Sequence, residues 1–269
     1  MIIMGFAEAG SLKNILSNNF KNILWENKIR ILGHLALGLK NIHGLGYFHK
    51  NLHSRNILVY YDDDHDYEYD NIKISDFGLS GPANKQKSDD KIYGILPYIA
   101  PEVLNGEPYT LSSDVYSFGV IMVELSSGNP PFYDRKHNLG LAIDFCNGLR
   151  PEFGKGTPEI YKKLAYRCMN ANPKQRPRIE ELKKILLFWY HSIYEILGYE
   201  RKEIEATFKE ANQEIPKISY KEDPNILYIS QAFMFKNLPK PTNSFTITLY
   251  LEDDMNNEGY YIFNILILN

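Results

Sequence analysis

An aspartate and an asparagine, each beside a short β-branched segment, offer the hard oxygen ligands that suit Mg²⁺. Asp76 follows the segment NIKIS at residues 71–75 and precedes Gly78, a residue type that tolerates an unusual backbone angle. Asn56 ends a short loop at the start of the segment NILVYY, residues 56–61. If the two segments form a two-stranded ribbon, a substrate phosphate could complete octahedral coordination of a metal there. The pattern predicts a site for magnesium and phosphate.

Two helices with different apolar patterns must hold this loop and ribbon in place. Residues 25–43 carry apolar side chains at helical spacing on one broad face, and the glycines at 44 and 46 are typical of a helix end. Residues 111–128 are apolar on nearly all sides, with Ser112 or Ser113 as the expected N-cap. Such a helix belongs in the centre of a domain.

The rest of the chain divides into a helical part and a tail. Weaker helical patterns follow in three places, residues 137–147, 157–168 and 178–190. Residues 1–190 are therefore expected to form one mostly helical α+β domain with a short β ribbon. Residues 191–269 are expected to be a tail, helical near 201–215 and then extended or disordered through the proline-rich stretch that follows.

Composition excludes several classes of protein. The 269 residues are 44% hydrophobic and 13% aromatic with a formal net charge of −3, so a buried core is expected, and neither nucleic acid nor membrane is indicated as a partner. The first ten residues lack the basic region of a signal peptide, and the apolar last ten are too short to span a bilayer. Only Cys146 and Cys168 occur, which favours a reducing compartment, the cytoplasm or the nucleus.

Five motifs in a fixed order carry a resemblance to a known family. They are HKNLHSRN at 49–56, DFG at 76–78, APE at 100–102, SSDVYSFGVIMVEL at 112–125 and CMNANPKQRPRIEEL at 168–182. Together they resemble the hinge and C-terminal lobe of eukaryotic protein kinases, and most closely the tyrosine-kinase-like group. The resemblance implies a protein-kinase-like fold, ATP and Mg²⁺ as cofactors, and a protein as substrate or partner.

The resemblance assigns roles in nucleotide binding to particular residues. Asn56 and Asp76 would hold Mg²⁺ and, through it, the phosphates of ATP. The opening segment IIMGFAEAGSL is similar to the last strand of the small lobe and the hinge. There Met4 would be the gatekeeper, and the Gly5 carbonyl and Ala7 amide would face adenine. A buried apolar strand is equally compatible with the same letters.

The resemblance also assigns residues that support the site. His49 would lie under Phe77 of the DFG motif, next to Gly78, and Asp114 would brace the catalytic loop. Arg176 would pair with Glu102 in the interior, which we favour over an ordinary surface pair.

The catalytic loop departs from the family at its central position. Where the family has an aspartate that accepts the substrate's hydroxyl proton, this sequence has Asn51, whose amide cannot take that proton. Lys50 replaces the family's arginine, which loses a planar fork suited to a phosphate. Arg55 is typical of tyrosine kinases at this position, but Ile95 replaces a threonine found in many serine/threonine kinases. The acceptor, Ser/Thr or Tyr, stays open.

Two functional readings follow. Kinases carry a glycine-rich loop, a β3 lysine and a partner glutamate before the hinge, whereas this sequence begins at the hinge, so the N-terminal lobe is expected to be missing. The first reading is a protein kinase domain, an ATP:protein phosphotransferase that is impaired as given. The alternative is a pseudokinase that acts as a protein-binding or scaffolding module. Ser88 and Tyr93 lie where phosphorylation commonly regulates the family, although both are also ordinary loop residues.

Overall fold

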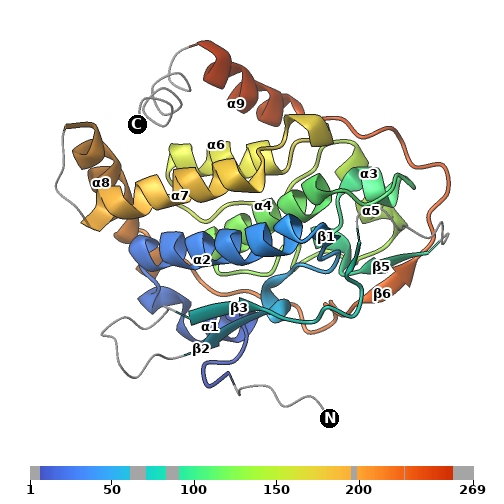
Figure 1. Ribbon diagram of the computed structural model, residues 1–269, viewed down its shortest axis with the longest axis horizontal. Helices are drawn as coiled ribbons and strands as arrows, with labels where there is room; N and C mark the ends of the chain where they lie inside the picture. The colour runs from blue at the N-terminus through green and yellow to red at the C-terminus, as the bar shows by residue number, and fades with distance from the viewer. Residues whose placement is uncertain (1–6, 61–70, 83–90, 195–198, 227, 257–269) are drawn as a thin grey trace.

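Helix α4 (Leu111–Ser127) lies between α2 (Trp25–Gly44) and α6 (Glu159–Cys168) in the computed structural model (Figure 1). The structure describes residues 7–60, 71–82, 91–194, 199–226 and 228–256. Nearly every side chain of α4 is buried, as expected for a helix that is apolar on all sides. The central placement predicted for it is therefore confirmed, and the domain is α+β with mostly helical content.

Within the described residues, three small antiparallel ribbons accompany the helices. In the first, β1 (Tyr47–Phe48) pairs with β4 (Gly81–Pro82). In the second, β2 (Ile57–Tyr60) pairs with β3 (Asn71–Ile74), so that Ile57 faces Ile74. This is the two-stranded ribbon that the sequence predicts. In the third, β5 (Ile92–Gly94) pairs with β6 (Gln231–Phe233), a partner that lies far away in the sequence.

The ends of the two main helices follow from local chemistry. Helix α2 ends at Gly44, and Gly46 just beyond it has φ of 73°, as expected for a helix closed by glycines. Helix α4 begins at Leu111 with Thr110 as its N-cap, so the prediction of Ser112 or Ser113 as the cap was wrong. Ser113 is instead the capping-box partner, and its Oγ accepts from the Thr110 amide at 3.1 Å.

The remaining helices complete the body of the domain. The predicted segments correspond to α5 (Leu139–Cys146), α6 and α7 (Ile179–Tyr194), and helix α3 (Pro101–Leu104) carries the APE motif. The sequence did not indicate α1 (Leu12–Asn19), a helix of eight residues, or α9 (Phe245–Asn256). Short 3₁₀ turns lie between these elements, at Phe20–Asn22, Ser54–Asn56, Leu96–Tyr98, Pro173–Gln175 and Ile215–Lys217. Within the described residues, none of the helices is both long and apolar enough to cross a membrane.

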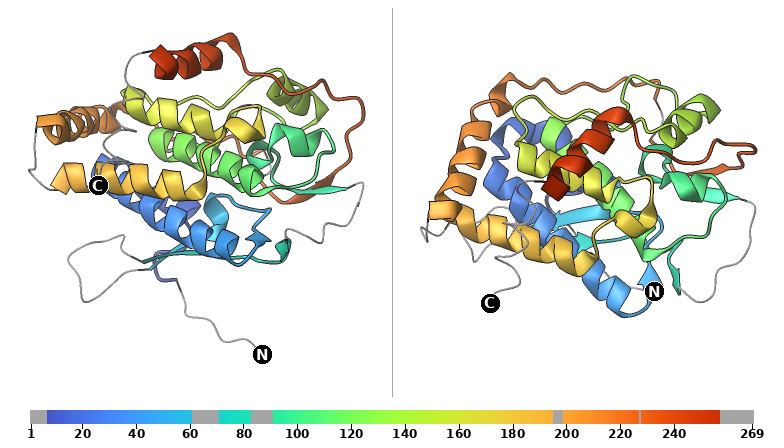
Figure 2. Two further views of the ribbon diagram at one scale, coloured as in Figure 1. Left: turned by 45° about the horizontal axis from the view of Figure 1, so that its top comes forward. Right: turned by 90° about the horizontal axis from the view of Figure 1, so that it is seen from above.

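The described residues of the tail, 191–194, 199–226 and 228–256, pack on the domain in several places. Helix α8 (Tyr199–Asn212) packs against α7 and α2, and Asn212 Oδ1 accepts from the Trp25 amide at 2.8 Å. The orange segment after α8 runs to β6 at the other end of the molecule and returns to α9, as the views in Figures 1 and 2 agree. There the Tyr250 hydroxyl donates to Glu159 at 2.9 Å, which ties α9 to α6. The described part of the tail is thus in contact with α2, α6, α7 and β5.

One buried amine stands out on the inner face of α2. The side chain of Lys28 is fully buried, and its Nζ has no hydrogen-bond partner in the described part of the chain. Two aromatic rings face it, with ring centres 4.3 Å away for Phe20 and 4.7 Å away for Trp25. Burial lowers the pKa of Lys28 from 10.5 to about 7. Holding this amine in its charged form therefore costs the folded state stability at neutral pH.

We expect Lys28→Met to raise the free energy of unfolding by about 2 kcal/mol near pH 6.5, because methionine fills similar space without desolvating an amine. Between the folded pKa of about 7 and the unfolded value of 10.5, the unfolded wild type binds more protons than the folded form. Wild-type stability therefore rises with pH in this window, and the advantage of methionine shrinks. Urea unfolding at about pH 6.5 and pH 9.5 measures both effects.

The exposed Lys21 supplies the control for this prediction, since Lys21→Met should change stability by less than about 0.5 kcal/mol at either pH. An equal gain from Lys28→Met at both pH values would contradict the assigned burial cost.

Candidate active site

Asp114, near the start of α4, holds the loop at residues 49–51 by two hydrogen bonds and contacts His43 of α2 by a third. Its Oδ2 accepts from the His49 amide at 2.8 Å and lies 3.0 Å from His43 Nε2, and its Oδ1 accepts from the Lys50 amide at 2.9 Å. Lys50 has φ of 66°, a strained value for a residue with a side chain. The buried carboxylate therefore fixes the backbone that presents Asn51, which is the bracing role that the family resemblance implies for Asp114.

Asn51, Asn56 and Asp76 meet at one point. The Nδ2 atoms of Asn51 and Asn56 donate to Asp76 Oδ2 at 3.1 Å and 3.2 Å, and Asn56 Nδ2 also donates to the Asn51 carbonyl at 2.9 Å. The β2–β3 ribbon brings them together, because the Ser75 amide donates to the Asn56 carbonyl at 2.8 Å. Asn51 Oδ1 is buried with no hydrogen-bond partner among the described residues. The predicted magnesium ligands are therefore neighbours, and Asn51 adjoins them.

The DFG segment differs from expectation at one residue. The prediction gave the unusual backbone angle to Gly78, but it is Asp76 that has φ of 61°, while Gly78 is outside the left-handed region. Gly78 instead donates its amide to Asp76 Oδ1 at 3.3 Å. The strained backbone angle thus falls on Asp76, the residue that carries the carboxylate, and strain of this kind is common at functional sites.

His49 lies beside Phe77 and stays neutral. The two ring centres are 5.3 Å apart in an edge-to-face arrangement, and His49 Nε2 lies 3.0 Å from the Ser75 carbonyl. Burial lowers the pKa of His49 despite the nearby carboxylate of Asp114. His49 therefore supports the loop by packing and does not carry charge at neutral pH.

Glu102 and Arg176 form a bidentate ion pair in the interior. Arg176 Nη1 donates to Glu102 Oε1 at 2.7 Å, and Nη2 donates to Oε2 at 2.6 Å. The Arg176 guanidinium also donates to the Asn170 and Ser112 carbonyls, and its side chain is 0% exposed. The pair joins the APE motif on α3 to the segment before α7.

The ligand set of Asp76 and Asn56 fits a hard cation that arrives with a phosphate. Among the described residues, no group of three or more His, Cys, Asp and Glu side chains is placed to hold a metal ion. Mg²⁺ usually takes only one or two protein carboxylates and completes its shell with water and substrate phosphates. The exposed carboxylate of Asp76 beside an amide side chain matches that pattern better than a structural metal site.

The structure does not bring all the predicted residues together. Met4 and Gly5 of the expected hinge, like Ser88, lie outside the described residues. Ala7 lies in a turn, where its carbonyl accepts from the Gly10 amide at 3.0 Å. Tyr93 is exposed on β5.

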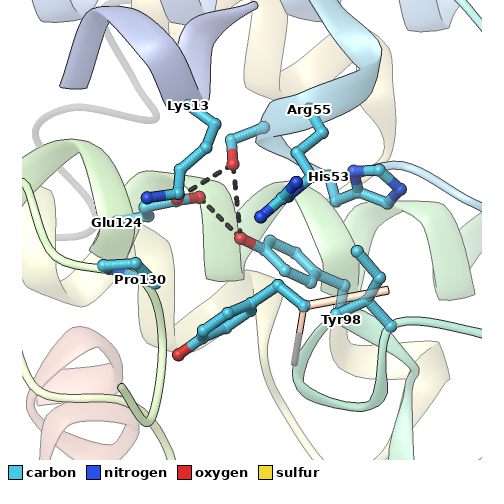
Figure 3. A pocket seen from close by; sticks show the side chains of 9 residues that line it. Lys13, His53, Arg55, Tyr98, Glu124 and Pro130 are labelled. Atoms are coloured by element: carbon cyan, nitrogen blue, oxygen red, sulfur yellow. Dashed lines mark hydrogen bonds between the residues drawn. The ribbon is translucent and has the colours of Figure 1, made fainter. Parts of the chain in front are cut away.

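Beside the loop lies a polar pocket that the sequence did not reveal. Its floor is Glu124 of α4, whose carboxylate accepts from Ser54 Oγ at 2.8 Å and from the Tyr98 hydroxyl at 2.7 Å (Figure 3). Burial raises the pKa of Glu124 to about 7. His53 and the exposed Arg55 line the same pocket, and burial lowers the pKa of His53 to about 4. Glu124, a charged residue directly after the apolar residues 120–123 of a buried helix, was the signal that could have pointed to this pocket.

Comparisons with known proteins agree on one family. Residues 1–186 match the family described as protein tyrosine and serine/threonine kinase. The chain is 30% identical over 183 residues to a probable serine/threonine-protein kinase of Dictyostelium discoideum, a match that covers 68% of this chain and 11% of that protein. It is 30% identical over 187 residues to dual specificity testis-specific protein kinase 2 of Rattus norvegicus, which covers 67% of this chain and 31% of the relative.

A third relative gives a similar picture. The chain is 31% identical over 213 residues to dual specificity protein kinase zakA of Dictyostelium discoideum, which covers 71% of this chain and 26% of that protein. In each of the three matches the aligned segment spans less than a third of the relative's length.

Proposed function

The chain belongs to the protein tyrosine and serine/threonine kinase family, and from that premise we propose that it is a kinase domain that binds Mg–ATP weakly and transfers phosphate slowly. The observation that carries the proposal is the contact between Asn51 and Asp76. An amide donates to the metal-binding carboxylate at 3.1 Å from the position where the family has a carboxylate base. Asn51 can orient an acceptor hydroxyl, but its amide cannot take the proton.

The proposed division of roles follows from the geometry around Asp76. Asp76 and Asn56 would hold Mg²⁺, which when bound neutralises charge on the phosphate oxygens. His49 and Asp114 keep the loop in place, and Asn51 faces the acceptor. The hinge atoms of Met4, Gly5 and Ala7 would contact adenine. Arg55, which stands directly before Asn56, supports placement in the tyrosine-kinase-like group.

Two features would limit catalysis in the proposed function. The 269 residues contain neither a glycine-rich G-x-G-x-x-G loop nor a strand resembling V-A-I-K, the parts that cover and contact the phosphates in this family. General-base catalysis is worth about 10² to 10⁴ in rate, and Asn51 removes it. A loose transition state still allows slow transfer through positioning alone.

The second candidate function is that of a pseudokinase that binds proteins. Asn51 favours it, since the loop keeps its shape and its metal ligands while the base is replaced. The named relatives include serine/threonine and dual-specificity kinases, so a Ser, Thr or Tyr hydroxyl of a protein is the acceptor that we propose if transfer occurs.

Binding of Mg–ATP tests the metal site directly. We expect Mg–ATP to raise the melting temperature of the chain and Asp76→Ala to abolish the shift, because the carboxylate that accepts from Asn56 Nδ2 is lost. The exposed Asp134 gives a matched control, since Asp134→Ala should leave the shift unchanged. ATP without a divalent cation should give less than half the shift. A shift that survives Asp76→Ala would count against this site.

A further inference from the structure

The tail strand β6 lies on the edge of β5, next to the loop that carries Asn51. The two strands are antiparallel, with Ile92 opposite Phe233 and Gly94 opposite Gln231. Strand β5 is close to the loop, because a Cβ placed on Gly94 would lie 3.8 Å from Asn51 Oδ1. Residues more than a hundred positions after Asn51 therefore pair with a strand, β5, that lies close to it.

A tyrosine anchors this part of the tail. Tyr228 is only 4% exposed and lines the pocket whose floor is Glu124 and whose wall includes His53. Its hydroxyl donates to the Pro131 carbonyl at 3.0 Å, and its ring meets His137 edge-on with centres 4.8 Å apart. The neighbouring side chain of Ile229 is 52% exposed. The tail thus buries the side chain of Tyr228 and leaves that of Ile229 in solvent.

Charged contacts hold the segment before the tyrosine. Lys13 of α1 forms an ion pair with Glu222 at 3.0 Å and a hydrogen bond with Tyr220. The Lys221 amide donates to Asn129 Oδ1 at 2.6 Å. Lys13 and Arg55, which line the pocket (Figure 3), are thus cations on the side of the domain where the tail brings the acidic Glu222 to Lys13.

An added strand, a buried aromatic anchor and an ion pair are the contacts by which one polypeptide recognises another. We propose that the edge of β5 and the pocket above Glu124 form a polypeptide-binding site. Its ligand is an extended strand with a buried tyrosine and an acidic residue on the N-terminal side, and residues 220–226 and 228–233 occupy it in cis. If the proposed function holds, Asn51 marks the position of the acceptor hydroxyl, and the bound tail would then compete with an acceptor protein for this site. That competition rests on the proposed function, whereas the site itself does not.

The short length of β6 makes this occupant exchangeable. A ribbon of three-residue strands is marginally stable by itself, so the tail depends on its anchors and on its tether. A tether of this kind gives an effective concentration on the order of millimolar, which a free peptide must overcome. Loosening the tail should therefore open the site to a peptide of the same sequence.

Fluorescence anisotropy with a labelled peptide of residues 220–235 tests the proposal on the full chain without nucleotide. Tyr228→Ala combined with Ala232→Pro removes the anchor and interrupts β6. This double variant should bind the peptide at least tenfold more tightly than wild type, whereas Ile229→Ala should match wild type. A peptide with alanine in place of Tyr228 should bind the double variant at least tenfold more weakly. Equal binding by wild type and the double variant, or no binding by a cooperatively melting double variant, would overturn the proposal.

Hydrogen exchange on wild type gives a second, independent measurement if the variant does not fold. Amides of residues 92–94 and 231–233 should exchange together, more slowly than in an unstructured peptide and faster than those of α4. Amide exchange at the unstructured rate would mean that the tail is not bound. Amide exchange as slow as in α4 would mean that the tail never leaves the site, so that no other peptide could replace it. Neither measurement uses ATP, so both can support the peptide-binding site even if the chain transfers no phosphate. Conversely, if both measurements contradict the peptide-binding site, the Mg–ATP test of the proposed function is unaffected.

Discussion

Replacing Asn51 with aspartate is expected to raise the rate of phosphate transfer by about 10² to 10⁴. The substitution restores a carboxylate at the end of a loop whose backbone is already fixed by Asp114. Asparagine and aspartate side chains have nearly the same size and shape, so the substitution does not block the approach of the acceptor. Transfer from labelled ATP to a mixed set of Ser, Thr and Tyr peptides measures the effect and also reports the acceptor class. The assay applies equally to this chain and to any longer natural protein that contains it.

The same substitution has a second consequence that does not require turnover. Asn51 Nδ2 now donates to Asp76 Oδ2 at 3.1 Å, and aspartate would replace that hydrogen bond by repulsion between two carboxylates. The variant should therefore melt at a lower temperature than wild type without metal, and Mg–ATP should narrow the difference. A melting curve with and without Mg–ATP would show whether the side chain at position 51 faces the metal site.

Asn51→Ala separates the two effects. It removes the hydrogen bond to Asp76 without adding a base, so its transfer rate should stay at or below the wild-type rate. Wild-type transfer as fast as that of Asn51→Asp would show that residue 51 does not limit the reaction and would exclude the pseudokinase reading. Phosphate transfer by Asn51→Asp with none by wild type would support the pseudokinase reading.

Arg176→Ala is expected to lower the free energy of unfolding by about 3 to 5 kcal/mol. The change leaves the carboxylate of Glu102, itself only 7% exposed, without its bidentate partner. It also leaves the carbonyls of Asn170 and Ser112 without a donor. Because a typical domain has only about 5 to 15 kcal/mol of stability, much of the folded population could be lost. Urea unfolding followed by circular dichroism measures the change.

A surface ion pair in the same chain gives a matched control. Arg135 pairs with Asp144 at 2.5 Å, but the two side chains are 41% and 40% exposed. Arg135→Ala should therefore cost less than about 1 kcal/mol, since water screens exposed pairs. Arg176→Lys should fall between the two, because lysine keeps the charge but loses the planar fork. A cost for Arg176→Ala no larger than that for Arg135→Ala would show that Glu102 is well solvated without its partner.

Helices α2 and α4 and the β2–β3 ribbon were predictable because their signals are local. An amphipathic face, a fully apolar segment and paired β-branched segments each show in a short window of sequence. Helix α1 and the ribbon of β5 and β6 were not predictable in this way. A helix of eight residues or a strand of three residues has little stability of its own, so packing decides whether it forms.

The candidate site divides in the same manner. The order of the motifs was enough to select Asn56, Asp76 and the departure at Asn51. It could not show that positive φ falls on Asp76 and not on Gly78, because that angle depends on how the β2–β3 ribbon delivers the carboxylate. Nor could it show that Glu124 forms the floor of a pocket, since its partners Ser54 and Tyr98 come from separate segments.

The sequence by itself determined the family and the asparagine at position 51 where the family has a carboxylate, because both depend on which residue stands at which position in an ordered set of motifs. Only the tertiary structure decided where the tail lies. Residues 231–233 pair with β5, and Tyr228 packs in the pocket above Glu124. Both contacts join segments about a hundred or more residues apart. Such contacts leave no periodic pattern in the chain, because their stability comes from a surface that exists only after the helices have packed.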